Sequence, residues 1–363
     1  MAFRHPVPVD QFHLDGTLRS LRPCGNGHIN RTWRAVTDTG AEYLIQLVNT
    51  DVFRDMDGLM SNISRVTQHV REKIRLDGGD PDRETMLIVP ALDGKLYCMT
   101  KEGCYRAYHF IRNAIALEKP RSAEDFYLTA RAFGKFQQQL LDFPAAELVE
   151  VIPDFHNTPK RLEALRYAAT MDVMGRKKDV EAELEFIFAR QEFAGTLTRG
   201  IASGALPLRV THNDTKLNNL LFDQETMTPL AVVDLDTVMP GTSLYDFGDG
   251  IRYGAATAAE DEMDLSLVSC DLELYEHFVR GWASVCGDTM SLGEKELLHL
   301  SPRILTLECG ARFLTDYLSG DTYFSTSRPG QNLDRCRTQL KLVADMEEKE
   351  AEMLRISKEY LHF

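Results

Sequence analysis

The chain lacks the features that mark secreted, membrane and zinc-binding proteins. Its seven cysteines are odd in number and form no Cys-x-x-Cys pair or zinc-ligand spacing, which argues against a disulfide framework and a zinc site. No stretch of about 18 uninterrupted apolar residues occurs, so no transmembrane helix is expected. The first residues also lack the apolar core of a signal peptide. We therefore expect a cytoplasmic protein with reduced, buried thiols.

Positive charge is also in deficit. The chain has 41 Lys and Arg against 55 Asp and Glu, which gives a formal net charge of −14. A surface of this sign repels a polyphosphate backbone, so we expect no nucleic-acid partner. We likewise expect no membrane partner, and a monomer or weak homodimer. With 363 residues, 44% of them hydrophobic, the chain is long enough for one large or two moderate cores.

The hydrophobic pattern changes along the chain. Up to about residue 112 it is typical of strands, at 42–49, 87–90, 96–99 and 105–111, with one helix at 56–74. After about residue 112, apart from the strands around 208–236, helical spacing prevails. It occurs at 124–141, 160–169, 180–199, 272–285, 294–317 and 335–354. This predicts an α+β fold of two lobes: a small antiparallel β-sheet lobe over residues 1–112, and a larger, mostly helical lobe over 113–363.

Acidic and amide residues follow two apolar strands in the second part of the chain. The strand containing Leu208 and Val210 leads to Asp214, which falls on a loop where it could accept a proton from a substrate hydroxyl. Five residues later, Asn219 precedes another apolar run and could offer its amide oxygen to a metal. The strand at 231–233 then delivers Asp234 and Asp236, two residues apart and therefore on one face.

This combination predicts a kinase. Carboxylates at the ends of buried strands are costly unless a cation lies among them, and phosphoryl transfer brings Mg²⁺ and needs little covalent chemistry from the protein. We assign Asp214 as the base, Asn219 as a Mg²⁺ ligand and one of Asp234 and Asp236 as a second Mg²⁺ ligand. Taken alone, an Asn-Asp pair is more often a turn or a helix cap.

Candidate ATP contacts lie in the first lobe. Gly25 and Gly27 allow backbone amides to approach phosphate, and His28 and Asn30 are the polar side chains that this loop would present, although a Gly-x-Gly is more often a simple hairpin turn. Adenine is expected against the segment 108–112. Its residues Phe110 and Ile111 have an equally good alternative as core residues.

The pattern His212-x-Asp214-x-x-x-x-Asn219, followed by Val-Val-Asp234, resembles the aminoglycoside phosphotransferase and choline kinase superfamily. The resemblance implies a protein-kinase-like fold. Segments across most of the chain resemble more narrowly the N-acetylhexosamine 1-kinases, which transfer the γ-phosphoryl group of ATP to the anomeric hydroxyl of N-acetylglucosamine or N-acetylgalactosamine: 25–30, 210–219, 234–241, 246–252, 308–317 and 337–343. This resemblance implies that the sugar is held by His28, Asp214, Tyr253, Arg312 and Tyr323.

Spacing alone favours a structural role for part of this set. Arg312 and Asp316 lie four residues apart and could form a surface pair on a helix. Asp246-Phe-Gly spells the metal-binding tripeptide of protein kinases, but it comes 32 residues after Asp214, whereas Asp234 comes 20 after it. The resemblance to the superfamily therefore implies that Asp234 binds the metal, with Asp236 behind it or as a substitute ligand. We therefore expect Asp246 to cap the following helix or to tie the catalytic loop by hydrogen bonds.

The chain departs from the superfamily at Gln46. It occupies the strand position where a phosphate-binding Lys or Arg is usual, and a neutral amide cannot offset phosphate charge. Arg65, Arg71 and Lys216 are candidates for the missing cation.

Alternatives to the sugar kinase remain. One is a kinase of the same superfamily that acts on another hexose, choline or an aminoglycoside; another is an inactive pseudokinase that binds nucleotide or sugar, which only Gln46 supports. A cationic acceptor would favour a pocket rich in Asp and Glu, whereas Arg312 and the aromatic residues near it favour a neutral sugar. A binuclear metallohydrolase is disfavoured, because His212 is the lone histidine of the catalytic stretch.

Overall fold

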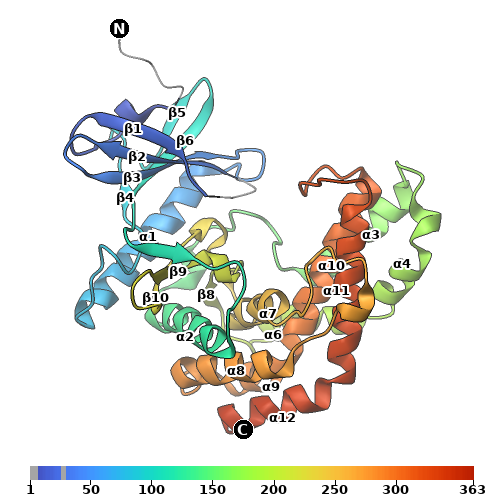
Figure 1. The fold of residues 1–363 in the computed structure, drawn as a ribbon. Coiled ribbons are helices and arrows are strands. Elements are labelled where there is room, and N and C mark those ends of the chain that lie inside the picture. Colours follow the sequence, from blue (N-terminus) through green and yellow to red (C-terminus); the bar gives the residue numbers. More distant parts are fainter. Residues whose placement is uncertain (1–6, 26–29) are drawn as a thin grey trace. The chain divides into compact units, whose positions relative to one another are not determined.

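The computed structural model describes residues 7–25 and 30–363 (Figure 1). The chain forms two compact units. The sheet unit runs from the start of the described chain to Ile115 and also takes in Glu147–Pro153 and Leu221–Val238. The helical unit consists of Ala116–Ala146, Asp154–Leu220 and Met239–Phe363. Two later segments thus return to the first unit, and the lobe boundary between residues 112 and 113 stays a prediction.

The sheet unit is built on an antiparallel sheet with strand order β1-β2-β3-β6-β4, and a further strand, β5, pairs with β6. The strands are β1 (Leu18–Pro23), β2 (Arg31–Thr37), β3 (Glu42–Val48), β4 (Ile88–Val89), β5 (Cys98–Thr100) and β6 (Gly103–His109). Aromatic and β-branched side chains such as Tyr43 and Ile45 alternate along these strands and bury one face in a common core with Tyr105 and Ala107.

One long helix, α1 (Met56–Leu76), also belongs to the sheet unit. Its side chains at three-to-four spacing, from Leu59 to Ile74, are buried, as the periodicity predicted. Asp55 caps the helix by accepting a hydrogen bond from the backbone N–H of Gly58 at 2.9 Å. A second, three-stranded sheet has the order β10-β9-β7, formed by β7 (Ala114–Ala116), β9 (Leu220–Asp223) and β10 (Pro229–Val232).

The helical unit packs around α10 (Ser301–Ser319), which contacts α3 (Thr158–Met171), α7 (Ser243–Gly254) and α11 (Gln331–Glu348). Its other helices are α2 (Ala123–Gln139), α4 (Glu181–Phe188), α5 (Gln191–Ala194), α6 (Thr196–Ala202), α8 (Leu272–Cys286), α9 (Leu292–Leu297) and α12 (Glu350–Leu361). A short antiparallel pair of strands, β8 (Arg209–Thr211) and β11 (Met239–Gly241), lies in the same unit. No helix in the part of the chain that the structure describes has the length and apolarity to cross a membrane.

The predicted α+β fold, with an antiparallel sheet lobe and a larger, mostly helical lobe, is confirmed. Three predicted helices are shorter than their periodicity suggested. The region 180–199 forms α4, α5 and α6, and Gly195, a poor helix former, separates the last two. The region 294–317 is divided before α10, where Pro302 lies in the first turn and has no N–H to continue a preceding helix. The region 335–354 breaks at Lys349 between α11 and α12.

Candidate active site

The loop after β8 makes a sharp turn that directs Asp214 out of the protein interior. Asn213 has a φ of 66°, in the left-handed region that Asn tolerates better than most residues. His212 and Asn213 are buried, whereas the Asp214 side chain is 28% exposed. The turn therefore presents a carboxylate at the surface of the helical unit on a backbone that is itself inside the protein.

Asp246, in the first turn of α7, holds this loop. One of its oxygens accepts a hydrogen bond from the backbone N–H of His212 at 3.0 Å, and the other accepts one from the N–H of Asn213 at 2.7 Å. Gln137 of α2 donates to the same carboxylate at 2.6 Å. Thr242, and not Asp246, caps α7. The hydrogen bonds from His212 and Asn213 confirm the other predicted role of Asp246, which is to tie the loop that carries Asp214. Burial raises the pKa of the Asp246 carboxyl.

We expect Asp246→Asn to lower kcat about 100-fold, the size of effect that a 1 Å misplacement of a catalytic group can have. One carboxylate oxygen becomes an NH₂ group that cannot accept, so at least one loop N–H loses its buried acceptor at a cost of about 1–3 kcal/mol. Steady-state kinetics and denaturant unfolding of the purified variant measure both effects. A kcat equal to that of the wild type would show that the loop does not depend on Asp246.

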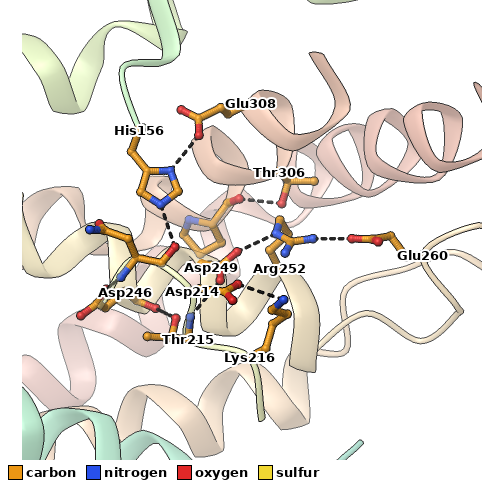
Figure 2. Close-up of polar contacts among 12 residues, drawn as sticks. His156, Asp214, Thr215, Lys216, Asp246, Asp249, Arg252, Glu260, Thr306 and Glu308 are labelled. Carbon is orange, nitrogen blue, oxygen red and sulfur yellow. Dashed lines mark hydrogen bonds and ion pairs between the residues drawn. The ribbon is translucent and has the colours of Figure 1, made fainter. Parts of the chain in front are cut away.

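Polar neighbours keep Asp214 ionised. The Lys216 ammonium lies 3.1 Å from one carboxylate oxygen (Figure 2). The Asn219 side-chain NH₂ group donates to the other at 3.0 Å. Burial raises the pKa of Asp214, but the charges of Lys216 and His212 and the Asn219 hydrogen bond outweigh it, so the pKa is below its usual value. A carboxylate held in this way can accept a proton from an approaching hydroxyl.

Asn219 lies at the end of a short 3₁₀ turn, Leu217–Asn219, just before β9. Its NH₂ group also donates to the backbone carbonyl of Asp214 at 2.8 Å, which leaves the amide oxygen as the atom available to an ion. Asp214 and Asn219, both predicted site residues, thus lie in direct contact within the helical unit. Asp234 and Asp236 belong to the sheet unit.

A second brace reaches the loop from later in α7. Asp249 accepts a hydrogen bond from the backbone N–H of Thr215 at 3.0 Å, and Arg252 donates to Asp249 and to Glu260, both at 2.8 Å (Figure 2). Arg252 is buried, so the two carboxylates compensate its charge. Tyr253, one of the predicted sugar contacts, is the next residue of α7 after Arg252 and is partly buried.

Arg312 and Tyr323 lie close together in the helical unit. The Arg312 guanidinium is 5.2 Å from the centre of the Phe155 ring, 5.5 Å from that of Phe324 and 6.0 Å from that of Tyr323. The alternative surface pair of Arg312 with Asp316 is wrong. Asp316 is buried and accepts hydrogen bonds from the backbone N–H groups of residues 322, 323 and 324 at 2.8–2.9 Å, which shapes the loop that carries Tyr323.

The sheet unit contains a buried cation that the sequence analysis missed. Arg106 on β6 lies opposite Gln46 on β3, is 1% exposed and donates to the Gln46 amide oxygen at 3.0 Å. It also donates to Asp236 at 2.9 Å. The signal that could have revealed it is an arginine in the middle of an apolar strand, since a buried arginine requires a carboxylate partner. Of the three cations proposed before, Arg65 pairs with Glu147, Arg71 with Asp82 and Lys216 with Asp214.

The Asp236 carboxylate connects this cation to the predicted nucleotide loop. It also accepts a hydrogen bond from the Asn30 side chain at 2.7 Å, and the Asn30 amide oxygen accepts one from the backbone N–H of Asn49 at 3.0 Å. Asp234, two residues earlier, is exposed and has a φ of 58°. The Arg106–Asp236 pair therefore anchors the turn from which Asp234 projects.

The remaining predicted nucleotide contacts have mixed surroundings. Gly25 has a φ of 79°, which favours glycine, and a side chain there would meet open space. Phe110 and Ile111 are partly exposed, and the Arg34 guanidinium lies 4.5 Å from the Phe110 ring centre. Gly27 and His28 lie outside the described residues. The roles assigned to these residues in binding nucleotide, metal and sugar stay predictions.

These residues fit a Mg²⁺ ion that is bound together with substrate phosphates better than they fit a metal site built from protein side chains alone. Within residues 7–25 and 30–363, no group of three or more His, Cys, Asp and Glu side chains could hold a metal. Mg²⁺ is commonly bound by one or two protein oxygens together with substrate phosphates and water. An amide oxygen from Asn219 and a carboxylate from Asp234 are donors of that kind.

Comparisons with known proteins identify the family and the fold of the chain. Residues 20–282 match the APH model, the phosphotransferase enzyme family. Similar solved structures include the microcompartment-associated aminopropanol kinase (TM-score 0.63, 16% identity, 95% of this chain and 96% of that chain) and an aminoglycoside phosphotransferase from Alicyclobacillus acidocaldarius (0.60, 12%, 98% and 95%). Spectinomycin phosphotransferase in complex with ADP and spectinomycin is another (0.53, 15%, 92% and 94%).

At these identities the structural likeness establishes the fold, which is protein-kinase-like, as predicted. The family match covers well over half of the chain and includes the loop of Asp214 and Asn219. The chain therefore belongs to the phosphotransferase enzyme family and is a small-molecule kinase.

Proposed function

We propose that the chain is an N-acetylhexosamine 1-kinase, which phosphorylates the anomeric hydroxyl of N-acetylglucosamine or N-acetylgalactosamine with ATP. The observation that carries the kinase activity is the ionised Asp214 carboxylate, held by Lys216 and Asn219 on a braced loop. The sugar assignment is supported by the motif resemblance and by Arg312 lying among three aromatic rings, a setting that suits a neutral, hydroxyl-rich ligand.

Asp214 would accept the proton of the anomeric hydroxyl. The hydroxyl oxygen forms a bond to the γ-phosphorus as the bond from that phosphorus to the β–γ bridging oxygen breaks, and ADP leaves. Mg²⁺, when bound, neutralises charge on the phosphates. Asn219 and Asp234 would hold it, while Asp236, already engaged by Arg106 and Asn30, braces the Asp234 turn.

ATP is proposed to bind in the sheet unit. Gly25, Gly27 and Asn30 would contact the phosphates, and Phe110 and Ile111 would contact adenine. Gln46 would act through Arg106, whose guanidinium it accepts a hydrogen bond from. Arg106 thus places a buried positive charge beside the neutral residue on β3, with Asp236 as its carboxylate partner. The sugar would contact His28, Tyr253, Arg312 and Tyr323. We also propose a cytoplasmic enzyme that is a monomer or a weak homodimer.

The test is ADP release with ATP and Mg²⁺ against N-acetylglucosamine, N-acetylgalactosamine, glucose, galactose, choline and kanamycin, with the position of the new phosphate assigned by phosphorus NMR. We expect an anomeric phosphate on the N-acetylated sugars only. Turnover of choline, kanamycin or a plain hexose instead would support kinase activity and refute the assignment of an N-acetylhexosamine as the acceptor. ATP binding without turnover of any member would favour a pseudokinase.

A further inference from the structure

A buried histidine connects α10 to the catalytic loop. One ring nitrogen of His156, Nδ1, lies 2.7 Å from a carboxylate oxygen of Glu308, and the other, Nε2, lies 3.1 Å from the backbone carbonyl oxygen of Asn213 (Figure 2). Thr158 donates to the second Glu308 oxygen at 2.7 Å. Glu308 is 1% exposed and His156 is 8% exposed, so water does not substitute for these contacts.

Proton counting restricts the state of this pair. A backbone carbonyl oxygen can only accept a hydrogen bond, and so can an ionised carboxylate. A neutral imidazole carries one N–H and would leave a lone pair facing one of the two oxygens. Both contacts are hydrogen bonds when Nε2 carries a proton for the carbonyl and a second proton lies between Nδ1 and the Glu308 oxygen. With the Glu308 carboxyl ionised, that second proton is on Nδ1, and His156 is an imidazolium that donates from each nitrogen.

The surrounding charges are consistent with an imidazolium and a carboxylate. Burial raises the pKa of Glu308, but the His156 charge, the hydrogen bonds from His156 and Thr158 and the Arg312 charge outweigh it, so its pKa is below the usual value. The other titratable neighbours are Tyr245 of α7, whose ring centre lies 5.0 Å from that of His156 and whose pKa is raised by burial, and Arg161 of α3, which interacts with Glu308.

The consequence falls on the peptide before Asp214. The N–H of Asn213 is held by Asp246, and its carbonyl is held by His156, so both ends of a residue in the left-handed region have fixed partners. The Asn213 carbonyl carbon is bonded to the nitrogen of Asp214. Any rotation of that carbonyl therefore turns the backbone that carries the proposed base.

We propose that His156, as an imidazolium held by Glu308, is a positioning residue for phosphoryl transfer: it fixes the Asn213 peptide and so aims the Asp214 carboxylate. The inference rests on the proposed role of Asp214 in the kinase reaction. His156 contacts no reacting atom in this assignment, so its effect belongs in kcat, while substrate affinity is set by other residues.

Kinetics of His156→Gln test the positioning role. The glutamine keeps an NH₂ group for one contact but turns an acceptor or a second misplaced donor toward the other, so we expect kcat to fall about 10–100-fold with little change in KM. His277→Gln is the matched control. His277 lies on α8, and its Nδ1 contacts the backbone carbonyl oxygen of Glu273 in the same helix. An unchanged kcat in His156→Gln, or an equal loss in the control, would overturn the proposal.

Nuclear magnetic resonance provides a readout that does not need turnover. In full-length wild-type protein labelled with ¹⁵N-histidine, we expect both ring nitrogens of His156 to carry a hydrogen-bonded proton, as the two contacts require. The backbone amide resonance of Asp214 should shift in His156→Gln and stay in place in His277→Gln. If the wild type phosphorylates none of the acceptors in the panel, the proposed function is refuted, but these resonances still test the positioning role. An unprotonated nitrogen in the His156 ring, or an Asp214 amide resonance that does not shift, overturns it.

Discussion

Replacing Asp214 with asparagine is expected to lower kcat about 10²–10⁴-fold, the usual contribution of a general base. The amide cannot accept the hydroxyl proton, yet it has nearly the shape of the carboxylate and keeps an oxygen for the Asn219 NH₂ group. The side chain is 28% exposed, so the substitution buries no new group. We therefore expect the melting temperature and the affinity for ADP to remain close to those of the wild type.

The measurement combines steady-state kinetics with ADP binding by calorimetry. Asp264→Asn is a suitable control, because this aspartate is exposed and bonds to Ser266 in a surface turn of the same unit. Activity in Asp214→Asn within about threefold of the wild type would remove Asp214 from the catalytic role, because a lost general base costs at least about 100-fold. Lost ADP binding would instead show that the variant damages the nucleotide site.

Replacing Arg106 with methionine is expected to destabilise the protein by about 3–5 kcal/mol, the usual cost of removing one partner of a buried ion pair. Asp236, 5% exposed, would lose the guanidinium that it faces and retain the hydrogen bond from the Asn30 amide. Burial lowers the pKa of Arg106, but the Asp236 charge more than offsets this, so its pKa is above the usual value and the guanidinium stays charged. The turn that carries Asp234 should loosen as well.

Denaturant unfolding followed by tryptophan fluorescence measures this loss, because Trp33 lies on β2 in the sheet unit. The double variant Arg106→Met/Asp236→Leu provides the decisive comparison. It removes both charges, so it should be more stable than Arg106→Met alone although it carries one more substitution. A single variant within about 1 kcal/mol of the wild type, or a double variant less stable than the single one, would contradict a paired buried charge at this position.

Local pattern was sufficient for the parts of the protein that depend on neighbouring residues. The alternation of Tyr43 and Ile45 predicted β3, and the three-to-four spacing from Leu59 to Ile74 predicted α1, because burial of one face imposes those periods. The pairing of Asp214 with Asn219 was also predictable, since only five residues separate them. The loop role of Asp246 needed one further idea, that an aspartate at a helix start can reach back to backbone N–H groups.

Tertiary structure decided which distant residues complete these elements. Arg106 meets Gln46 across 60 residues, and His156 meets Glu308 across 152, so no local spacing relates either pair. Arg312 and Asp316 show the opposite case: their helical spacing suggested a pair, but the buried Asp316 carboxylate accepts hydrogen bonds from three backbone N–H groups of the loop at 322–324 instead. The sequence by itself determined the periodic elements and the motif of the base, because these depend on residues a few positions apart. The partners of buried charges were decided only by the fold, because desolvation makes each such charge bind whatever polar group the packing brings to it.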